Sequence, residues 1–501
     1  MNSFLINECA PLAKLGAEIQ EWSFLERFPE LAFIAKSNNS LGKQLEQSYL
    51  NAVEFSERYV APQALAIDKK MTEDPHYVPE DLLKKACEYK LFSTMFPAFL
   101  GGSGLHPICT FITYEVIATH CVGIANLLGV NGLGICCVLA SFDPRGLSVI
   151  TKEICENEKN GIPTFLSTCV TEPGAGSDAE DADEFANAQL TTTAKKVDGG
   201  YILNGTKIFI SNGGHAQIHA VMTFDADGAH TPDDQMLLLV RSGSKGLSIP
   251  RLENKMGQKA CHAAEVHFDN VFVPENMMCR KDESSTSSYS YTGIANVLGV
   301  TRAAVGAWST GVAENAYRTA LRYARDNDFL GQPMEQQQWV RLELAQLARR
   351  AQVARSTYIG ALLAVSTTGL ISPLAITQKE PKLPDWLKHN NTVRNLREKV
   401  LSGDLTHRAF KFMAQLQTSA ERDIATGYGD VAKVSCSELA LENCQKAITL
   451  MGKGGLRHEN GAEKLLRDVR LLQIYEGTNQ VNMLDYVKRR VIRQFDTQLS
   501  L

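Results

Sequence analysis

Three short strings in this 501-residue sequence combine glycines, hydroxyl groups and a carboxylate in patterns that can serve chemistry. Residues 171–178 (TEPGAGSD) predict a Gly-rich loop, whose exposed backbone N–H groups can meet a closely approaching ligand. Residues 207–213 (KIFISNG) predict a strand that places an aromatic ring and a hydroxyl two positions apart, on one side of the pleat. Within residues 467–480 (RDVRLLQIYEGTNQ), Glu476 stands among apolar and small residues. The strand could stack on a flat ring and hydrogen-bond its edge, whereas the loop lacks both the GxGxxG dinucleotide order and the GK[ST] ending of a P-loop.

The elements that must position these strings fall into three regions. Apolar residues recur every three or four positions from Leu41 to about Asn160, which predicts helices. Short β-rich runs follow, and turn signals separate them, notably Asp198-Gly199-Gly200 and the hairpin dipeptide Asn204-Gly205. These runs are 201–203, 207–211, 220–224, 236–240 and 265–273. Helical periodicity returns from residue 295, so the order predicts an α+β fold with a β sandwich or barrel between helical regions.

The composition excludes several classes of protein. Lys and Arg number 51 against 56 Asp and Glu, a formal charge of −5 without a basic run, which argues against a nucleic-acid partner. The 12 cysteines show no CxxC pair or metal-ligand spacing, so we expect no metal site and a reducing compartment. No targeting pattern opens the chain, and we expect a cytoplasmic protein. The uncharged stretch 121–142 could span a membrane by length, but its glycines and missing basic flanks favour a buried helix.

Taken together and in this order, the three strings resemble the signatures of the acyl-CoA dehydrogenase family of FAD-dependent flavoproteins. The resemblance covers about residues 45–490 and implies a cleft for FAD between three domains. These would be an N-terminal helical domain (45–164), a middle β domain (165–280) and a C-terminal four-helix bundle (290–501). Residues 1–44 and an insertion at about 371–425 exceed the family core. The insertion is interpreted as a decorating loop or, alternatively, as a cover over the cleft or an oligomer face.

The family reaction is the α,β-dehydrogenation of an acyl-CoA thioester to the trans-2-enoyl-CoA, with a hydride passing to flavin N5. Glu476 matches the family's catalytic base, which must be desolvated to remove an α-proton. Some relatives carry the base on another helix, at the position of Thr301, which cannot serve as one. The resemblance implies that Ser177, Thr301, Arg302 and Gly477 bind the substrate, Arg302 matching the family arginine behind it.

The resemblance also assigns residues to FAD. Phe209 stands where the family usually has tryptophan, and Ser211 where it has a threonine whose hydroxyl reaches flavin N5. The serine keeps the same donor chemistry. The expected contacts are Thr168, Val170, Thr171, Gly176, Ser177, Phe209, Ile210, Ser211, Gln338, Thr449, Gly452, Lys453, Thr478 and Gln480.

Two departures from the family pattern concern the flavin diphosphate. The family's R-x-x-F-G arginine, which reaches the FAD of a neighbouring subunit, is missing from the aligned residues 327–331 (NDFLG), and Arg325 comes two residues early. Lys453 replaces the second glycine of the family's Gly-rich turn, and we hypothesise that it supplies the lost cation. A third departure is His262, which we interpret as an exposed loop histidine or a contact behind the site, because the family chemistry needs no base there.

Three functions stay open at this level. The first is an acyl-CoA dehydrogenase that passes electrons to an electron-transfer flavoprotein, as a homodimer or homotetramer. The second is a flavoenzyme of the same fold that acts on an acyl carrier protein thioester, as an oxidase or as an enoyl-CoA reductase. The third is a non-catalytic relative that keeps flavin as a structural element or binds DNA, against which Glu476 and the negative charge argue.

Overall fold

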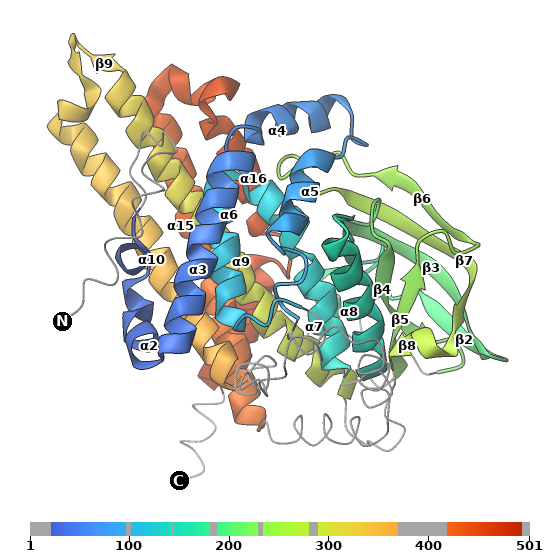
Figure 1. The fold of residues 1–501 in the computed structure, drawn as a ribbon. Helices are drawn as coiled ribbons and strands as arrows, with labels where there is room; N and C mark the ends of the chain where they lie inside the picture. Colours follow the sequence, from blue (N-terminus) through green and yellow to red (C-terminus); the bar gives the residue numbers. More distant parts are fainter. Residues whose placement is uncertain are drawn as a thin grey trace.

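The computed structural model describes residues 22–96, 102–141, 144–180, 188–228, 234–279, 289–368 and 418–492. A block of helices comes first, a β sheet follows, and long helices complete the described chain (Figure 1). This segregation confirms the predicted α+β class. The first block contains α1 (Phe24–Arg27), α2 (Ala32–Ser37), α3 (Asn39–Phe55), α4 (Ala64–Glu73), α5 (Glu80–Glu88), α6 (Pro107–Gly129), α7 (Asn131–Ala140) and α8 (Pro144–Lys159).

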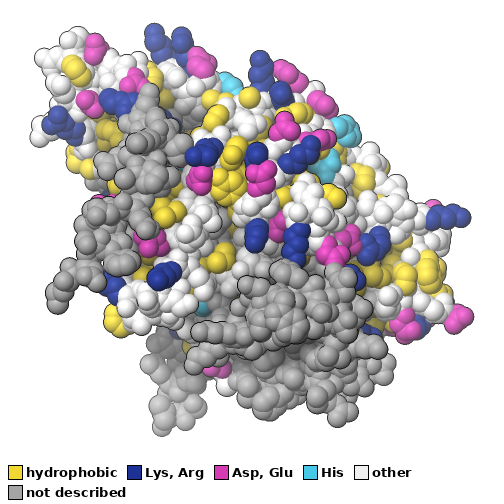
Figure 2. All heavy atoms as spheres, in the orientation of Figure 1, with side chains coloured by type: hydrophobic (Ala, Val, Ile, Leu, Met, Phe, Trp, Pro, Cys, Tyr) yellow, Lys and Arg dark blue, Asp and Glu magenta, His cyan; other side chains and the backbone are white. Residues whose placement is uncertain are grey.

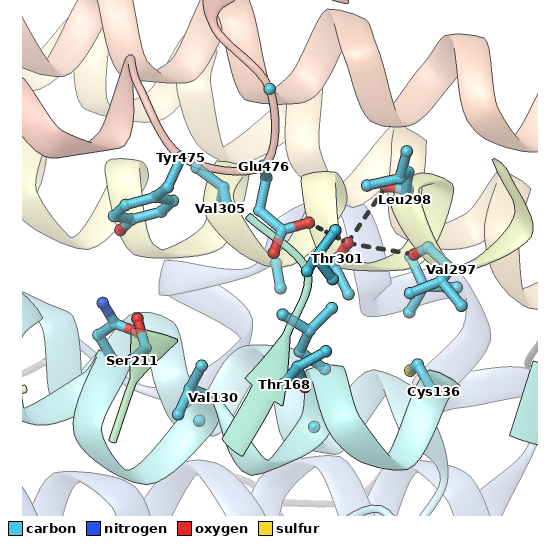
Figure 3. A pocket seen from close by; sticks show the side chains of 18 of the residues that line it. Val130, Cys136, Thr168, Ser211, Val297, Leu298, Thr301, Val305, Tyr475 and Glu476 are labelled. Carbon is cyan, nitrogen blue, oxygen red and sulfur yellow. Dashed lines mark hydrogen bonds between the residues drawn. The ribbon is translucent and has the colours of Figure 1, made fainter. Parts of the chain in front are cut away.

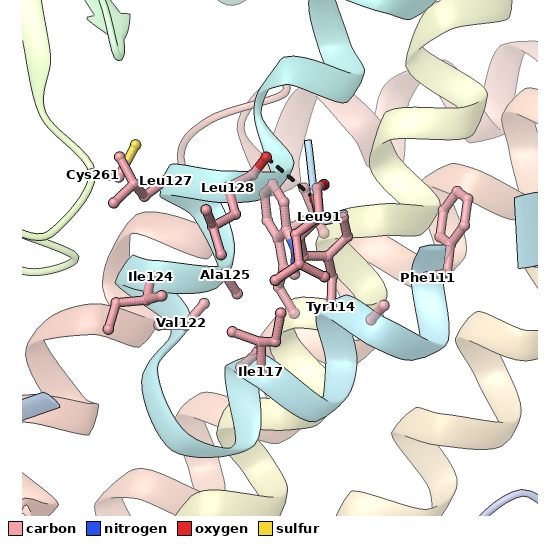
Figure 4. Close-up of a cluster of buried hydrophobic side chains, with 14 of the residues drawn as sticks. Leu91, Phe111, Tyr114, Ile117, Val122, Ile124, Ala125, Leu127, Leu128 and Cys261 are labelled. Atoms are coloured by element: carbon pink, nitrogen blue, oxygen red, sulfur yellow. Dashed lines mark hydrogen bonds between the residues drawn. The ribbon is translucent and has the colours of Figure 1, made fainter. Parts of the chain in front are cut away.

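Helix α6 is the centre of the first block. Nearly all of its side chains are buried, because α3, α4 and the later helices α9 (Tyr289–Asp326) and α10 (Gln338–Thr368) pack around it. Figure 4 shows part of the apolar cluster that it builds. Within the described residues, α6 is the one helix long and apolar enough to cross a membrane, and 94% of its most apolar window is buried inside the protein. The uncharged stretch 121–142 is divided between α6 and α7, which Val130 separates.

The middle region is one mixed sheet of eight strands. Its order is β6-β7-β3-β2-β4-β5-β8, and β1 pairs in parallel with β4. Strand β5 also approaches β7, with which it is not paired, so the sheet curls over itself in the barrel-like form of the prediction. The strands are β1 (Leu166–Cys169), β2 (Thr193–Val197), β3 (Gly200–Ser211), β4 (Ile218–Asp225), β5 (Gln235–Arg241), β6 (Leu247–Leu252), β7 (Ala263–Pro274) and β8 (Met278–Cys279).

One of the two predicted turns is confirmed and the other is wrong. Asp198 and Gly199 do connect β2 to β3, with Gly199 at φ 73° and Val197 paired with Gly200. Asn204-Gly205, in contrast, lies inside β3, where the register against β7 shifts between Leu203 and Gly205. A Cβ at Gly205 would lie 2.5 Å from Thr192 Oγ1, so this glycine admits a neighbouring strand at a bulge.

A second irregularity in β3 changes how the predicted stacking pair is presented. Phe209 has φ 58°, and the register against β7 shifts again between Lys207 and Ile210. The regular pleat that would place Phe209 and Ser211 on one side is therefore interrupted. The bulge leaves Phe209 59% exposed.

The C-terminal region is built from three long helices that pack against one another: α9, α10 and α15 (Ser419–Met451). The shorter α16 (Ala462–Leu472) packs against α9 and α15, and α17 (Asn479–Tyr486) packs on α15. Helix α9 ends in an exposed hairpin of β9 (Asp328–Phe329) and β10 (Gln332–Pro333). The predicted insertion lies outside the described residues up to residue 417.

A buried cluster of charges ties the N-terminal helices to this bundle. Arg27 of α1 and Arg355 of α10 bind the same oxygen of Glu115 on α6, at 3.0 and 2.9 Å, and Tyr358 donates to the other oxygen at 2.6 Å. Burial alone would raise the pKa of Glu115, but the two guanidinium groups outweigh it and hold the pKa below its ordinary value. Residues just N-terminal to the family core therefore contribute to the interior of the molecule.

We predict that Glu115→Gln destabilises the protein by about 3–5 kcal/mol, because two buried guanidinium groups lose their shared counter-charge. Chemical denaturation followed by circular dichroism measures the effect. The control is Glu80→Gln, since Glu80 is exposed and lies 4.0 Å from Lys84, and its change should stay within about 0.5 kcal/mol. Equal stability of the two variants would contradict the structural role of the cluster.

Candidate active site

A cavity of about 420 Å³ lies where the three regions meet. Its walls come from α6 and α7, from β1 and β3, from α9, and from the segment that joins α16 to α17. Figure 3 shows Glu476 on one side of this cavity, with Thr168 and Cys136 facing it from the opposite wall. The predicted site residues that line it are Thr168, Val170, Thr171, Gly176, Ser177, Phe209, Ile210, Ser211, Thr301, Glu476, Gly477 and Thr478.

Glu476 occupies the irregular segment between α16 and α17, with a left-handed backbone conformation of φ 58°. Such a conformation is unfavourable for a residue other than glycine and persists only where neighbours hold it. The Nε of Arg302 donates to the carbonyl oxygen of Glu476 at 3.1 Å, and Lys433 Nζ donates to the carbonyl oxygen of Gly477 at 2.7 Å. Two buried cations thus fix consecutive peptide groups and turn the carboxylate toward the cavity.

The carboxylate of Glu476 has one close partner, the hydroxyl of Thr301, which donates to Oε2 at 2.6 Å (Figure 3). Burial raises the pKa of Glu476 above its ordinary value of 4.5. The Thr301 hydrogen bond and the charges of Arg302 and Lys433 act in the opposite direction but do not cancel the effect of burial. The result is a carboxylate that binds a proton more readily than one in water, beside an apolar cavity.

Arg302 lies behind Glu476 and does not line the cavity. Its Nη1 binds Asp430 of α15 at 2.6 Å and Asp485 of α17 at 3.0 Å, and all three side chains are buried. Burial raises the pKa of Asp430 to about 7, and the charge of Asp485 adds to it, although Arg302 opposes both. Arg302 is therefore a residue that positions Glu476 from behind.

The Gly-rich loop is attached to the Glu476 segment from the β side. Ser177 Oγ accepts a hydrogen bond from the backbone N–H of Thr478 at 3.2 Å, and the side chain of Thr478 caps α17. The loop itself is held by Glu172, which binds Lys207 Nζ at 2.8 Å in a fully buried ion pair. Sequence analysis missed this pair, because 35 residues separate its members and each stood in a string with another interpretation.

Five predicted contacts lie away from the cavity. Gln338 is exposed at the start of α10, Thr449 and Gln480 are exposed on α15 and α17, and Gly452 and Lys453 are exposed beyond the end of α15. None of them lines the cavity among the described residues.

The alternative of an exposed loop position for His262 is wrong, because only 6% of the residue is exposed. It contacts His215, and burial lowers its pKa to about 3. His262 does not line the cavity either.

Several residues that line the cavity were not foreseen. They are supplied mainly by α6, α7 and the second turn of α9 beyond Thr301, among them Thr110, Tyr114, Cys136 and Trp308. Only the helical periodicity marked these positions in the sequence, and periodicity cannot tell a cavity wall from a packed core.

The cavity wall has features that suit a flat cofactor. Thr168 Oγ1 is buried and has no hydrogen-bond partner within the described parts of the chain. A Cβ at Gly176 would meet no atom within 4 Å, so space remains beside the loop. Phe209 presents its ring at the cavity. An unpaired edge group, free space and an exposed ring together fit a flavin. No group of three or more His, Cys, Asp or Glu among the described residues could hold a metal ion.

The face shown in Figure 2 carries Lys and Arg side chains interspersed with Asp and Glu, and they do not gather into a basic patch there. This distribution differs from the clustered cations of a nucleic-acid footprint.

Comparison with known families agrees with this geometry. The chain matches the N-terminal, middle and C-terminal domains of acyl-CoA dehydrogenases over residues 44–142, 167–271, and 292–377 with 405–492. The chain therefore belongs to the acyl-CoA dehydrogenase family and is a flavin-dependent oxidoreductase. The interruption of the C-terminal match falls within the predicted insertion.

Individual relatives are distant but span nearly the full length. An acyl-CoA dehydrogenase of Bacillus subtilis (strain 168) is 26% identical over 439 residues, which are 86% of this chain and 93% of the relative. The structure of butyryl-CoA dehydrogenase from Megasphaera elsdenii shares the fold, with a TM-score of 0.66 and 21% identity over 89% of this chain and 97% of that one. PigA, solved with FAD and proline, gives 0.64 and 19% over 91% and 98%. These matches imply a flavin cofactor.

We predict that Thr301→Val raises the pKa of Glu476 further, since the lost hydrogen bond had lowered it. A hydrogen bond to a charged group contributes about 1.5–3 kcal/mol, which corresponds to about 1–2 pH units. The acid limb of the pH profile of kcat/KM for flavin reduction should move up by that amount. Thr367→Val is the control, because Thr367 is an exposed helical threonine with the same bond to its own helix. An unmoved limb would show that Thr301 does not tune Glu476.

Proposed function

We propose that this protein is an FAD-dependent acyl-CoA dehydrogenase, which converts an acyl-CoA thioester to the trans-2-enoyl-CoA. The observation that carries the proposal is the Glu476 carboxylate, held at the wall of a mainly apolar cavity with a raised pKa. A general base works best when its pKa approaches the working pH, and burial moves a carboxylate in that direction. Membership of the acyl-CoA dehydrogenase family supports the same reaction.

In this proposal Glu476 removes the α-proton of the thioester. The positive φ turns its side chain into the cavity, and Arg302 and Lys433 hold the segment so that the carboxylate keeps one position. Thr301 orients the carboxylate through Oε2, which leaves Oε1 for the proton. The backbone N–H of Glu476 would donate to the thioester oxygen as negative charge develops there. Apolar side chains around these groups exclude water, which strengthens each interaction.

FAD, when bound, supplies the acceptor for the hydride that leaves the β-carbon. We propose that the ring of Phe209 stacks on the flavin and that the hydroxyls of Thr168 and Ser211 hydrogen-bond its edge. Ser177 and Thr478, which already bind each other, would hold the segment beside it. The remaining proposed contacts in the cavity are Val170, Thr171, Gly176 and Ile210.

The five predicted contacts that lie away from the cavity support an oligomer. Because they are exposed, these residues can reach the cofactor of a neighbouring subunit rather than that of their own. We propose a homodimer or homotetramer on this basis, with Lys453 at the diphosphate of the neighbour's FAD. An electron-transfer flavoprotein is the proposed electron acceptor.

The test is anaerobic mixing of the FAD-loaded protein with a panel of acyl-CoAs while flavin absorbance is followed. We predict that at least one straight-chain or branched acyl-CoA bleaches the flavin and that Glu476→Gln slows bleaching by about 10²–10⁴-fold, because the base is lost. Glu438→Gln, an exposed glutamate on α15, is the control and should bleach at the normal rate.

The possible outcomes separate the candidate functions. Bleaching by an acyl carrier protein thioester but by none of the CoA esters would replace the proposed substrate. Rapid consumption of oxygen after bleaching would indicate an oxidase. Bleaching at the wild-type rate in Glu476→Gln would show that another group removes the proton.

We predict that Lys453→Ala weakens FAD binding by about tenfold or less, in line with the modest effect of one exposed cation on an anionic group. The dissociation constant is measured by fluorescence titration of FAD into deflavinated protein. Lys446→Ala, which removes another exposed lysine near the end of α15, should leave it unchanged. Equal dissociation constants for wild type and Lys453→Ala would remove the hypothesis that Lys453 replaces the family arginine.

A further inference from the structure

The cavity continues along α9 beyond the Glu476 carboxylate. Thr301, Ala304, Val305 and Trp308 all line it, and their spacing of three, four and seven places them on one face of the helix. Seven residues at 1.5 Å each carry the wall about 10 Å from Thr301 to Trp308. A chain that starts at Glu476 and follows α9 therefore ends beside Trp308.

Two polar atoms at this far end have no hydrogen-bond partner within the described residues. They are Nε1 of Trp308 and Oγ1 of Thr110, on α9 and α6, and their residues are 7% and 4% exposed. Both residues line the cavity. Buried polar groups in proteins are almost always paired, because an unpaired one forfeits its hydration without compensation. Two such groups in one cavity wall indicate partners that a ligand brings.

The neighbouring side chains cannot serve as these partners. The hydroxyl of Tyr114 is one helical turn from Thr110 and is already engaged, with the carbonyl oxygens of Leu91 at 2.8 Å and Leu128 at 3.3 Å (Figure 4). The indole is also fixed in place. A Cβ at Gly129 would lie 2.9 Å from Trp308 Cζ2 and 3.5 Å from Tyr114 Cδ1, so the two rings close around this glycine.

We propose that the acyl group of the substrate carries a neutral hydrogen-bond acceptor, a carbonyl, hydroxyl or ether oxygen, that binds Trp308 Nε1 and Thr110 Oγ1 at the far end of the cavity. The proposal rests on the proposed function, because it takes the substrate to be an acyl thioester held at Glu476. An indole N–H only donates, so the ligand atom must accept. Glu476 is the one charged side chain among the described residues that line the cavity, and a carboxylate would find no counter-charge there.

This arrangement selects against unsubstituted chains. A plain alkyl terminus in the same place would leave both polar groups buried and unpaired, which a site pays for in lost affinity for that ligand. The chain with an oxygen at the correct distance satisfies both groups at once. The pair thus specifies where along the acyl chain the oxygen lies, about two helical turns from the thioester along α9.

The experiment compares straight-chain acyl-CoAs with keto-acyl-CoAs of equal length, the keto group being moved outward carbon by carbon beyond the β-carbon. The FAD-loaded wild type should favour one keto position by about tenfold or more in kcat/KM over the unsubstituted chain. Trp308→Phe, which keeps the ring and removes the N–H, should abolish the preference while changing kcat/KM for the unsubstituted chain by less than about threefold. Thr110→Val should reduce the preference partly, and Trp339→Phe, at an exposed tryptophan on α10, should leave it intact.

A binding measurement separates this inference from the proposed reaction. In Glu476→Gln, the change in flavin absorbance on titration with each CoA ester gives a dissociation constant without turnover. A preference for a keto chain there, removed by Trp308→Phe, supports the inference even if no ester bleaches the wild-type flavin, an outcome that would defeat the proposed function alone. Equal binding of every matched pair, or equal losses for both chains in Trp308→Phe, would overturn the inference while bleaching left the proposed function standing.

Discussion

The buried guanidinium of Arg302 is the interaction on which the site depends. From α9 it reaches Asp430 of α15, Asp485 of α17 and the carbonyl oxygen of Glu476, at 2.6, 3.0 and 3.1 Å. A guanidinium in the interior is tolerated only when charges and hydrogen bonds surround it, so these partners must stay in place together. The left-handed backbone of Glu476, which costs about 1–3 kcal/mol, is held by the same set of contacts. The bundle thus determines where the carboxylate points.

The same arrangement sets the electrostatics of the carboxylate. The cations that hold the segment, Arg302 and Lys433, lower the pKa of Glu476, and Thr301 lowers it as well. Burial outweighs them, because the cavity between α7, α9 and the curled sheet is lined chiefly by apolar side chains. Rigidity and basicity therefore have different sources. The backbone contacts act on the carbonyl oxygens behind the cavity, whereas the carboxylate itself faces the apolar side.

Local strings predicted more of this site than of the framework behind it. The three motifs supplied the twelve predicted residues around the cavity, since a loop, a strand and a turn each carry their chemistry within a few positions. The two bulges of β3 escaped prediction, because Asn204-Gly205 permits the same backbone conformations in a hairpin as in a bulge. The Glu172–Lys207 pair and the unpaired Thr110 and Trp308 depend on which helices and strands meet, and no local pattern records that. Segregation of helices from strands, in contrast, was evident from periodicity alone.

The central claim is that burial keeps Glu476 basic at the cavity wall. Infrared difference spectra between the wild type and Glu476→Gln, recorded across a pH series on the FAD-loaded protein, isolate the C=O band of the protonated carboxyl of this residue. The account predicts that the band persists well above pH 4.5, the ordinary pKa of a glutamic acid. A band that disappears at or below that pH would contradict it, because the cations and Thr301 would then dominate over burial.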